Sequence, residues 1–227
     1  MSKSTTSSRR IDQVRGRPFA VGLSPEVLSR VQAGVMATRY RGVAFLKNPF
    51  DVVLYMRLLE SLRPRTIIEV GSCEGGSAVW FRDQASALGL DTKVISLDIS
   101  PPAQAFDGVS FMHGDAGAPD RTFPHGLLAS SPHPWLVVED SAHTYDTTKA
   151  VMDYFDRLLI RGDYLVVEDG VVADLPTDPY GRYEDGPNRA VAEFLAETGE
   201  RYEIDERQCD YFGHNVTYCP NGWLVRR

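Results

Sequence analysis

The chain has 227 residues, 43% hydrophobic and 24% charged, which fits one globular domain with additions and leaves no apolar run of membrane-spanning length. The net charge of −7 excludes the basic surface that a nucleic-acid-binding protein needs and favours a small or neutral substrate. The three cysteines form no Cys-x-x-Cys pair, which indicates neither a disulfide framework nor a zinc site, so we expect a cytoplasmic protein without membrane or nucleic-acid partners.

The first part of the chain is predicted as a disordered tail over residues 1–18, because its start is rich in Ser and Thr, followed by a helical cap over residues 19–63. Ser24-Pro25-Glu26 begins one helix of the cap by the N-cap and proline rules. A second amphipathic helix covers residues 52–59 and ends before Pro64. A helical region at this position covers an active site or forms a dimer contact, so we expect a homo-oligomer built through these helices.

The stretch Thr66 to Ala78 predicts a strand, a tight loop and a helix, because a β-branched run meets an acid and then a glycine-rich turn. Its order, Glu69-x-Gly71-x-x-x-Gly75-Gly76, lacks the Gly-x-Gly pair of the dinucleotide fingerprint. The loop resembles motif I of the S-adenosylmethionine (SAM)-dependent methyltransferases. The alternative is that this glycine-rich turn has a structural role only.

The chain beyond this loop alternates between apolar strands and helices. Strands are predicted at residues 93–98, 109–115, 135–140 and 163–169, and helices at residues 147–160 and 188–197. Strands that are apolar almost throughout and separated by helices form a parallel sheet covered on both faces. Ligands bind such a sheet at the carboxyl ends of its strands.

The C-terminal part changes to short strands at residues 202–205, 216–218 and 223–225, and Pro220-Asn221-Gly222 predicts a hairpin between the last two. A parallel sheet that ends in an antiparallel hairpin is typical of methyltransferases. We therefore predict an α/β, Rossmann-like class I methyltransferase domain over residues 64–227, with a mostly parallel seven-stranded sheet.

Acidic residues follow several of these strands. Asp98 stands roughly 20 to 30 residues past the glycine-rich loop, where a carboxylate accepts both ribose hydroxyls; a cap on the turn at Ser100 is the alternative. Asp115, after His113-Gly114, is a candidate acceptor for the adenine amino group, and a turn-forming Asp is the alternative there.

A near repeat, Val-Val-Glu-Asp at residues 137–140 and 166–169, ends two strands that should be neighbours. Carboxylates that converge repel one another unless a cation lies among them or some protonate. Oxygen ligands without a His or Cys cluster favour Mg²⁺ over Mn²⁺ or Ca²⁺. The alternative is that one acid of each pair caps a helix and the other is buried in hydrogen bonds. His143, three residues past Asp140, is a candidate general base beside such an ion, with a capping or surface histidine as its alternative.

From Thr66 to about Gly170 the chain resembles the Mg²⁺-dependent class I O-methyltransferases, among them catechol O-methyltransferase. It departs from the catechol enzymes at His143, Glu168 and Asp169, where they have a lysine base and an Asp-Asn pair. With these departures and the C-terminal Asn-Gly-Trp-Leu-Val-Arg, the chain is similar to the cephalosporin hydroxylase/rhamnosyl O-methyltransferase group of bacterial secondary metabolism, and to macrolide-sugar O-methyltransferases.

The residues and the resemblance together imply a complete site. SAM is expected around Glu69, Gly71, Ser72, Gly75, Ser77, Asp98, Asp115 and Asp140. Mg²⁺ is expected on Asp140, Glu168 and Asp169, with His143 as base and Asp140 beside it. The acceptor is expected to be a small molecule with adjacent hydroxyls, such as a sugar, because two hydroxyls can chelate the metal. The long loop at residues 171–186 is interpreted as an acceptor lid with contacts from Tyr180, Arg182 and Tyr183.

Two other functions stay open on the sequence. One is a related enzyme that does not methylate oxygen, such as a hydroxylase-associated component. The other is a non-catalytic scaffold with the same fold, since fold alone does not determine function.

Overall fold

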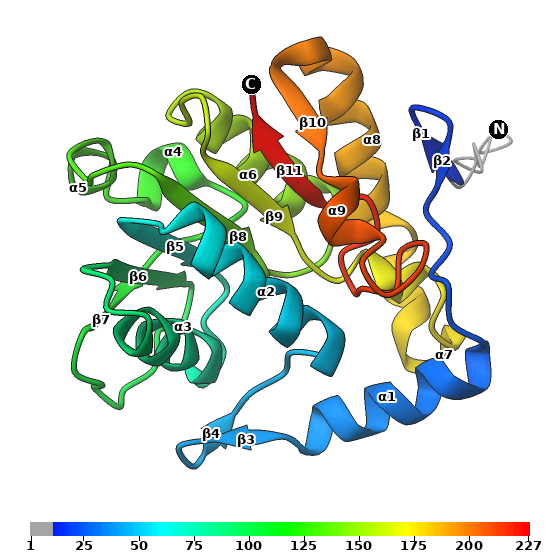
Figure 1. Ribbon diagram of the computed structural model, residues 1–227, viewed down its shortest axis with the longest axis horizontal. Coiled ribbons are helices and arrows are strands. Elements are labelled where there is room, and N and C mark those ends of the chain that lie inside the picture. Colours follow the sequence, from blue (N-terminus) through cyan, green and yellow to red (C-terminus); the bar gives the residue numbers. More distant parts are fainter. Residues whose placement is uncertain (1–10) are drawn as a thin grey trace, which may run out of the picture.

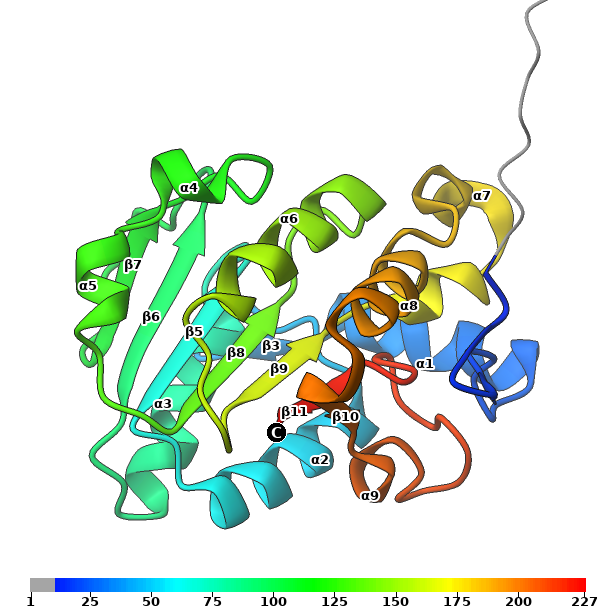
Figure 2. The ribbon, with the colours of Figure 1, turned by 90° about the horizontal axis from the view of Figure 1, so that it is seen from above.

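The computed structural model describes residues 11–227, apart from the side chain of Thr177. One seven-stranded sheet has the order β10-β11-β9-β8-β5-β6-β7, with helices on both faces (Figures 1 and 2). The parallel strands are β5 (Thr66–Val70), β6 (Lys93–Asp98), β7 (Val109–His113), β8 (Trp135–Glu139) and β9 (Tyr164–Val167). The predicted class I methyltransferase fold is confirmed.

The central strands are almost wholly apolar and buried along their full length, which explains why sequence alone located them. The chain winds outward in both directions from β5, so that β6 and β8 flank it. Such a switch point opens a crevice at the carboxyl ends of the strands. Strand β8 ends at Glu139 and strand β9 ends at Val167. Asp140 and the pair Glu168-Asp169 therefore lie in the loops that follow these strands.

Helices cover both faces of the sheet (Figure 2). Helices α6 (Tyr145–Asp156) and α8 (Gly186–Thr198) pack together on one face, with the short α4 (Pro119–Thr122) and α5 (His125–Ala129) nearby. Helices α2 (Pro49–Leu62) and α3 (Gly76–Ala87) lie on the other face. Thr144 caps the start of α6 by accepting from the N–H of Thr147, so that helix begins earlier than predicted.

The predicted helical cap divides into two parts. Helix α1 (Pro25–Ala37) begins at the expected Ser24 cap and lies beside α7 (Thr177–Tyr180) at the carboxyl edge of the sheet (Figures 1 and 2). Its Leu28 and Val35 pack in a small separate cluster. Helix α2 instead belongs to the main core, through Leu54, Tyr55, Leu58 and Leu59. The two helices are connected through a hairpin of β3 (Arg39–Tyr40) and β4 (Val43–Ala44). Oligomerisation through these helices stays a prediction.

The N-terminal segment is more ordered than we predicted. Residues 1–10 of the predicted tail lie outside the described residues, but residues 11–18 do not form a disordered continuation. They contain an antiparallel hairpin of β1 (Gln13–Val14) and β2 (Arg17–Pro18), with Val14 buried against the core.

Two strands pair antiparallel at the C-terminal end of the sheet as predicted, but the predicted hairpin across Pro220-Asn221-Gly222 was wrong. Strand β11 (Trp223–Arg226) pairs antiparallel with β9 and with β10 (Tyr202–Ile204), and residues 216–218 form no strand. The buried carboxylate of Asp51 accepts from Thr217 Oγ1 and Tyr218 N, so these residues bond to α2 instead of to a neighbouring strand.

Short elements fill the remaining connections. They are α9 (Glu206–Cys209) and three 3-10 helices, η1 (Gly170–Ala173), η2 (Gly181–Tyr183) and η3 (Gly199–Arg201). Within residues 11–227 no helix has the length and apolar character needed to cross a membrane.

Candidate active site

A cavity of about 440 Å³ opens where the carboxyl ends of the central parallel strands meet. Its volume lies in the range of small-molecule sites. The residues predicted around SAM that line it are Gly71, Ser72, Ser77, Asp98, Asp115 and Asp140. Gly75 and Glu69 are not among the lining residues. The other polar residues of the lining are Lys47, Cys73, Ser141, His143, Thr147 and Asp169.

The glycine-rich loop has a conformation that only its glycines permit. Gly71 has φ +107°, and a Cβ there would lie 1.9 Å from the backbone oxygen of Asp140. Gly75 has φ +88° and is the N-cap of α3. The loop therefore passes directly against the end of β8, which brings the start of α3 and Asp140 to the same cavity.

Asp98 fixes this loop from the neighbouring strand. Its Oδ2 accepts from the N–H groups of Ser72 at 2.8 Å and Cys73 at 3.1 Å, and its Oδ1 accepts from Ser100 N at 2.8 Å. The turn-capping role considered for Asp98 is thus present, together with its position on the cavity wall. A carboxylate has about four acceptor positions, so one remains for a ribose hydroxyl.

Asp115 likewise combines two roles, because its Oδ1 accepts from Gly117 N at 2.8 Å in a turn while the residue lines the cavity. Glu69 is fully buried and accepts from Ser96 Oγ at 2.6 Å; Ser96 in turn contacts Ser72 Oγ. Burial raises the pKa of Glu69 to about 7. Glu69 therefore supports the loop from inside the sheet.

Three groups that could hold a metal ion converge on one side of the cavity: the carboxylates of Asp140 and Asp169 and the imidazole of His143. One ligand atom from each lies within 4.8 Å of the others. His143 Nε2 is 3.4 Å from Asp169 Oδ2, and its Nδ1 is buried without a hydrogen-bond partner among the described residues. His143 and Asp169 both have left-handed backbones, with φ of 55° and 57°. Strained conformations of this kind occur at functional sites.

Glu168 does not join this group as predicted. Its Oε1 accepts from Tyr55 Oη at 2.5 Å and forms an ion pair with Lys47 Nζ at 2.6 Å, inside the protein. The side chain is only 4% exposed. The third group beside Asp140 and Asp169 is therefore His143, whereas the sequence predicted Glu168.

Lys47 is the functional residue that the sequence analysis missed. Its Nζ contacts both Asp140 Oδ2, at 2.5 Å, and Glu168 Oε1, and its side chain is 2% exposed. A lysine between Leu46 and Asn48 just before a helix carries no distinctive signal. The buried ammonium of Lys47 therefore supplies part of the positive charge that we inferred among the carboxylates.

The electrostatics of this cluster follow from burial and charge. Burial raises the pKa of Asp140, Glu168 and Asp169, while Lys47 and His143 oppose that shift. For Lys47, burial acts to lower the pKa, but Asp140 and Glu168 outweigh it and the pKa rises well above its usual value. The pKa of His143 is also raised, because Asp169 and Asp140 outweigh its burial. The site therefore favours bound positive charge.

The predicted lid residues lie in different places. The Tyr183 ring meets the His143 imidazole edge-on, with centroids 5.5 Å apart, and the Arg182 guanidinium lies over the Tyr183 ring. Tyr180 accepts a hydrogen bond from Gln32 of α1 and packs beside the second apolar cluster. Of the three, Tyr183 is the one in contact with the candidate base.

Comparisons with known proteins identify the family to which this sequence is similar. The sequence model of the family "Rhamnosyl O-methyltransferase/CmcI" matches residues 32–227. A rhamnosyl O-methyltransferase of Mycobacterium leprae is 33% identical over 195 residues, which cover 84% of this chain and 83% of that protein. One from Mycobacterium tuberculosis is 31% identical, over 83% of this chain and 78% of that protein.

Solved structures of CmcI are also similar. An apo structure has a TM-score of 0.65 and 30% identity, over 84% of this chain and 76% of that one. A structure of CmcI with Mg and SAM has a TM-score of 0.65 and 28% identity, over 85% of this chain and 77% of that one.

Proposed function

Since the chain belongs to the rhamnosyl O-methyltransferase/CmcI family and is a SAM-dependent O-methyltransferase, we propose that it methylates a sugar hydroxyl with the help of a divalent cation. The acceptor carries a second hydroxyl next to the one that is methylated, as in a sugar of a bacterial secondary metabolite. The observation that carries the proposal is the meeting of Asp140, His143 and Asp169 on the wall of the cavity that the glycine-rich loop forms.

The cavity suits SAM in size and in chemistry. It has room for a ligand of this size, and Asp98 and Asp115 offer carboxylate oxygens to the hydroxyl, amino and ammonium groups of the methyl donor. Among the described residues, the lining contains no arginine and one lysine, Lys47, which is already paired with two carboxylates, so the wall next to the glycine-rich loop offers no free lysine or arginine to a pyrophosphate. SAM, with its positive sulfonium, fits this acidic wall.

The cluster also suits a divalent cation. Asp140 and Asp169 supply the oxygen ligands that Mg²⁺ prefers, with Mn²⁺ as the alternative because an imidazole stands beside them. A bound cation would lower the pKa of an acceptor hydroxyl and hold two adjacent oxygens in one orientation. Glu168 would have to leave Lys47 and Tyr55 to become a ligand, so we assign it to the support of the site.

His143 is arranged to take the acceptor proton. His143 Nε2 lies 3.4 Å from Asp169 Oδ2, and Nδ1 has no hydrogen-bond partner among the described residues, so when Nε2 carries the proton Nδ1 is the nitrogen left to accept one. Bound SAM would supply the methyl group: its carbon–sulfur bond would break as the bond to the acceptor oxygen forms, which leaves S-adenosylhomocysteine. The hydroxyl proton passes to His143, and the imidazolium is stabilised by the same carboxylates that raise its pKa.

The experiment that tests this function uses SAM with a radiolabelled methyl group and methyl rhamnoside as the acceptor. We expect methyl transfer that a chelator abolishes and that Mg²⁺ or Mn²⁺ restores. Rhamnosides that lack one of two adjacent hydroxyls should react far more slowly. Methyl transfer that is unchanged by the chelator would contradict the role of the cation, and bound SAM with no transfer to any diol would favour a non-methylating relative or a scaffold.

A further inference from the structure

One end of the lid segment (residues 174–185) is bonded to the N-terminal strap (residues 11–23). The backbone N–H of Ile11 donates to Asp185 Oδ2 at 2.7 Å. Asp185 is the N-cap residue of α8, yet its side chain makes no capping bond to that helix. Its buried carboxylate therefore serves the strap, although an Asp at this position would ordinarily cap its own helix.

The other end of the lid segment is bonded in the same way. The backbone N–H of Val21 donates to Asp174 Oδ2 at 2.9 Å. Between the two ends, Gln32 Nε2 of α1 donates to Tyr180 Oη at 2.9 Å. The N-terminal part of the chain thus contacts the lid segment at both ends and near its middle.

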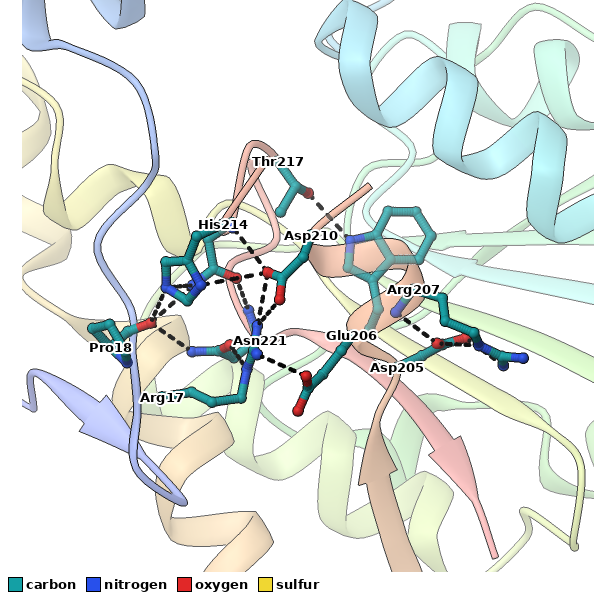
Figure 3. Close-up of polar contacts among 11 residues, drawn as sticks. Arg17, Pro18, Asp205, Glu206, Arg207, Asp210, His214, Thr217 and Asn221 are labelled. Carbon is teal, nitrogen blue, oxygen red and sulfur yellow. Dashed lines mark hydrogen bonds and ion pairs between the residues drawn. The ribbon is translucent and has the colours of Figure 1, made fainter. Parts of the chain in front are cut away.

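The strap is itself fixed to the C-terminal loop by Arg17 (Figure 3). Arg17 Nη2 donates to both carboxylate oxygens of Asp210, at 2.8 and 3.0 Å, and Nη1 is 3.2 Å from Glu206. Its Nε donates to Asn221 Oδ1 at 2.9 Å, and Asn221 Nδ2 donates back to the Pro18 carbonyl. The Arg17 side chain is 15% exposed and that of Asp210 is 29% exposed, so the charge-assisted bonds between them are partly shielded from solvent, whereas Glu206 is 64% exposed.

The lid segment connects this anchor to the candidate active site. Tyr183 lies within the segment and packs edge-on against His143. The residues that line the main cavity begin at Ala44, so the strap itself does not contact the proposed SAM site. A shift of the strap would therefore displace the lid segment, on the acceptor side of the site, before it altered the residues around SAM.

We propose that the N-terminal strap positions the lid segment over the acceptor, and that Arg17 is the positioning residue that holds the strap in place. This inference rests on the proposed function, because it assigns the lid segment to the acceptor. The strap precedes residue 32, where the match to the family model begins, so the contacts of residues 11–23 are a feature of this chain beyond that match.

The test compares Arg17→Gln with the unaltered protein by hydrogen–deuterium exchange of peptides that cover residues 174–185. Loss of one partly shielded, charge-assisted anchor should speed exchange there roughly tenfold, because local opening becomes easier. The affinity for S-adenosylhomocysteine, measured by calorimetry, should change less than about twofold. With methyl rhamnoside as acceptor, KM for the acceptor should rise while KM for SAM stays constant.

Two further variants define the result. Arg30→Gln on α1 is the control, because the Arg30 side chain is 80% exposed and its ion pair is with Glu26 on the same helix. It should leave exchange and both KM values unchanged. Asp185→Ala, which removes the acceptor of the Ile11 bond, should reproduce the effect of Arg17→Gln on the lid segment.

Two outcomes would overturn the inference. Exchange in the lid segment that is unchanged in Arg17→Gln would show that the strap does not hold it. Exchange that rises equally in β5 and β8 would show a general loss of stability in place of positioning. Hydrogen exchange and the affinity for S-adenosylhomocysteine can be measured without methyl transfer. A failure of methyl transfer would therefore count against the proposed function, while the exchange experiment would still test the role of the strap.

Discussion

Replacing Lys47 with methionine should destabilise the protein strongly, because it leaves the buried carboxylate of Glu168 and the partly buried carboxylate of Asp140 without their cation. The ammonium lies 2.5 Å from Asp140 and 2.6 Å from Glu168, and the side chain is 2% exposed. Removing one partner of a buried ion pair costs about 3–5 kcal/mol. For a chain of this size, 1 kcal/mol shifts Tm by about 2–4 °C, so we expect Tm to fall by roughly 6–20 °C.

The loss should also depend on pH. Burial raises the pKa of Asp140 and Glu168 above their ordinary values of 3.8 and 4.5, and Lys47 opposes that rise. Without the ammonium their folded-state pKa values rise further. An acid with a raised folded-state pKa contributes stability at low pH that is lost as the pH rises through that pKa. The difference in unfolding free energy between the two proteins should therefore be larger at pH 8 than at pH 5.

The assay is urea unfolding at both pH values, with Lys149→Met as a matched control. Lys149 Nζ also contacts two carboxylates, those of Asp153 and Glu197, each at 2.7 Å, but these are 51% and 59% exposed. A surface pair contributes about 0–1 kcal/mol, so the control should lose little. Equal losses in the two variants, or a loss in Lys47→Met that is the same at both pH values, would refute the reasoning.

Three more substitutions, one of them with a matched control, test the proposed base, the buried Asp51 and the glycine-rich loop. His143→Gln should lower kcat by roughly 10²- to 10⁴-fold with little change in SAM affinity, and full activity would exclude His143 as the base. Asp51→Asn should flatten the pH dependence of the unfolding free energy between pH 4 and 7 by up to about 1.4 kcal/mol per pH unit, because burial raises the pKa of Asp51 to about 7 and its stabilisation fades as pH rises. Gly71→Ala should cost more than about 2 kcal/mol and weaken SAM binding, since its Cβ would meet the Asp140 carbonyl, whereas Gly34→Ala, with nothing within 4 Å, should be neutral or stabilising in thermal melts.

Local signals in the sequence were enough to locate the sheet and most of the cavity wall. The apolar strands, each followed by an acid, predicted that Asp98, Asp140 and Asp169 lie at one edge of the sheet. This prediction does not depend on the order of the strands, because parallel strands all have their carboxyl ends at the same edge. The glycines were equally readable, since the positive φ of Gly71 and Gly75 is a requirement of the loop itself.

Partners that are distant in sequence left no such signal. Lys47 meets Asp140 and Glu168 only after folding, so neither the role of Lys47 nor the inward direction of Glu168 could be predicted. Residues 216–218 have the composition of a strand, but Asp51 binds their polar groups. The strap of residues 11–23 has no periodic apolar pattern, and it is held by polar bonds such as those of Arg17 together with the buried side chains of Val14 and Phe19.

The cation site of Asp140 and Asp169 can be tested by a titration of Mn²⁺ into the protein with S-adenosylhomocysteine present, followed by electron paramagnetic resonance. We expect a single bound Mn²⁺ per chain that Mg²⁺ displaces, and we expect Asp169→Asn to weaken its binding at least tenfold. Failure to bind Mn²⁺ at millimolar concentration, or equal binding by the variant, would contradict the assignment of Asp140 and Asp169 as the cation site.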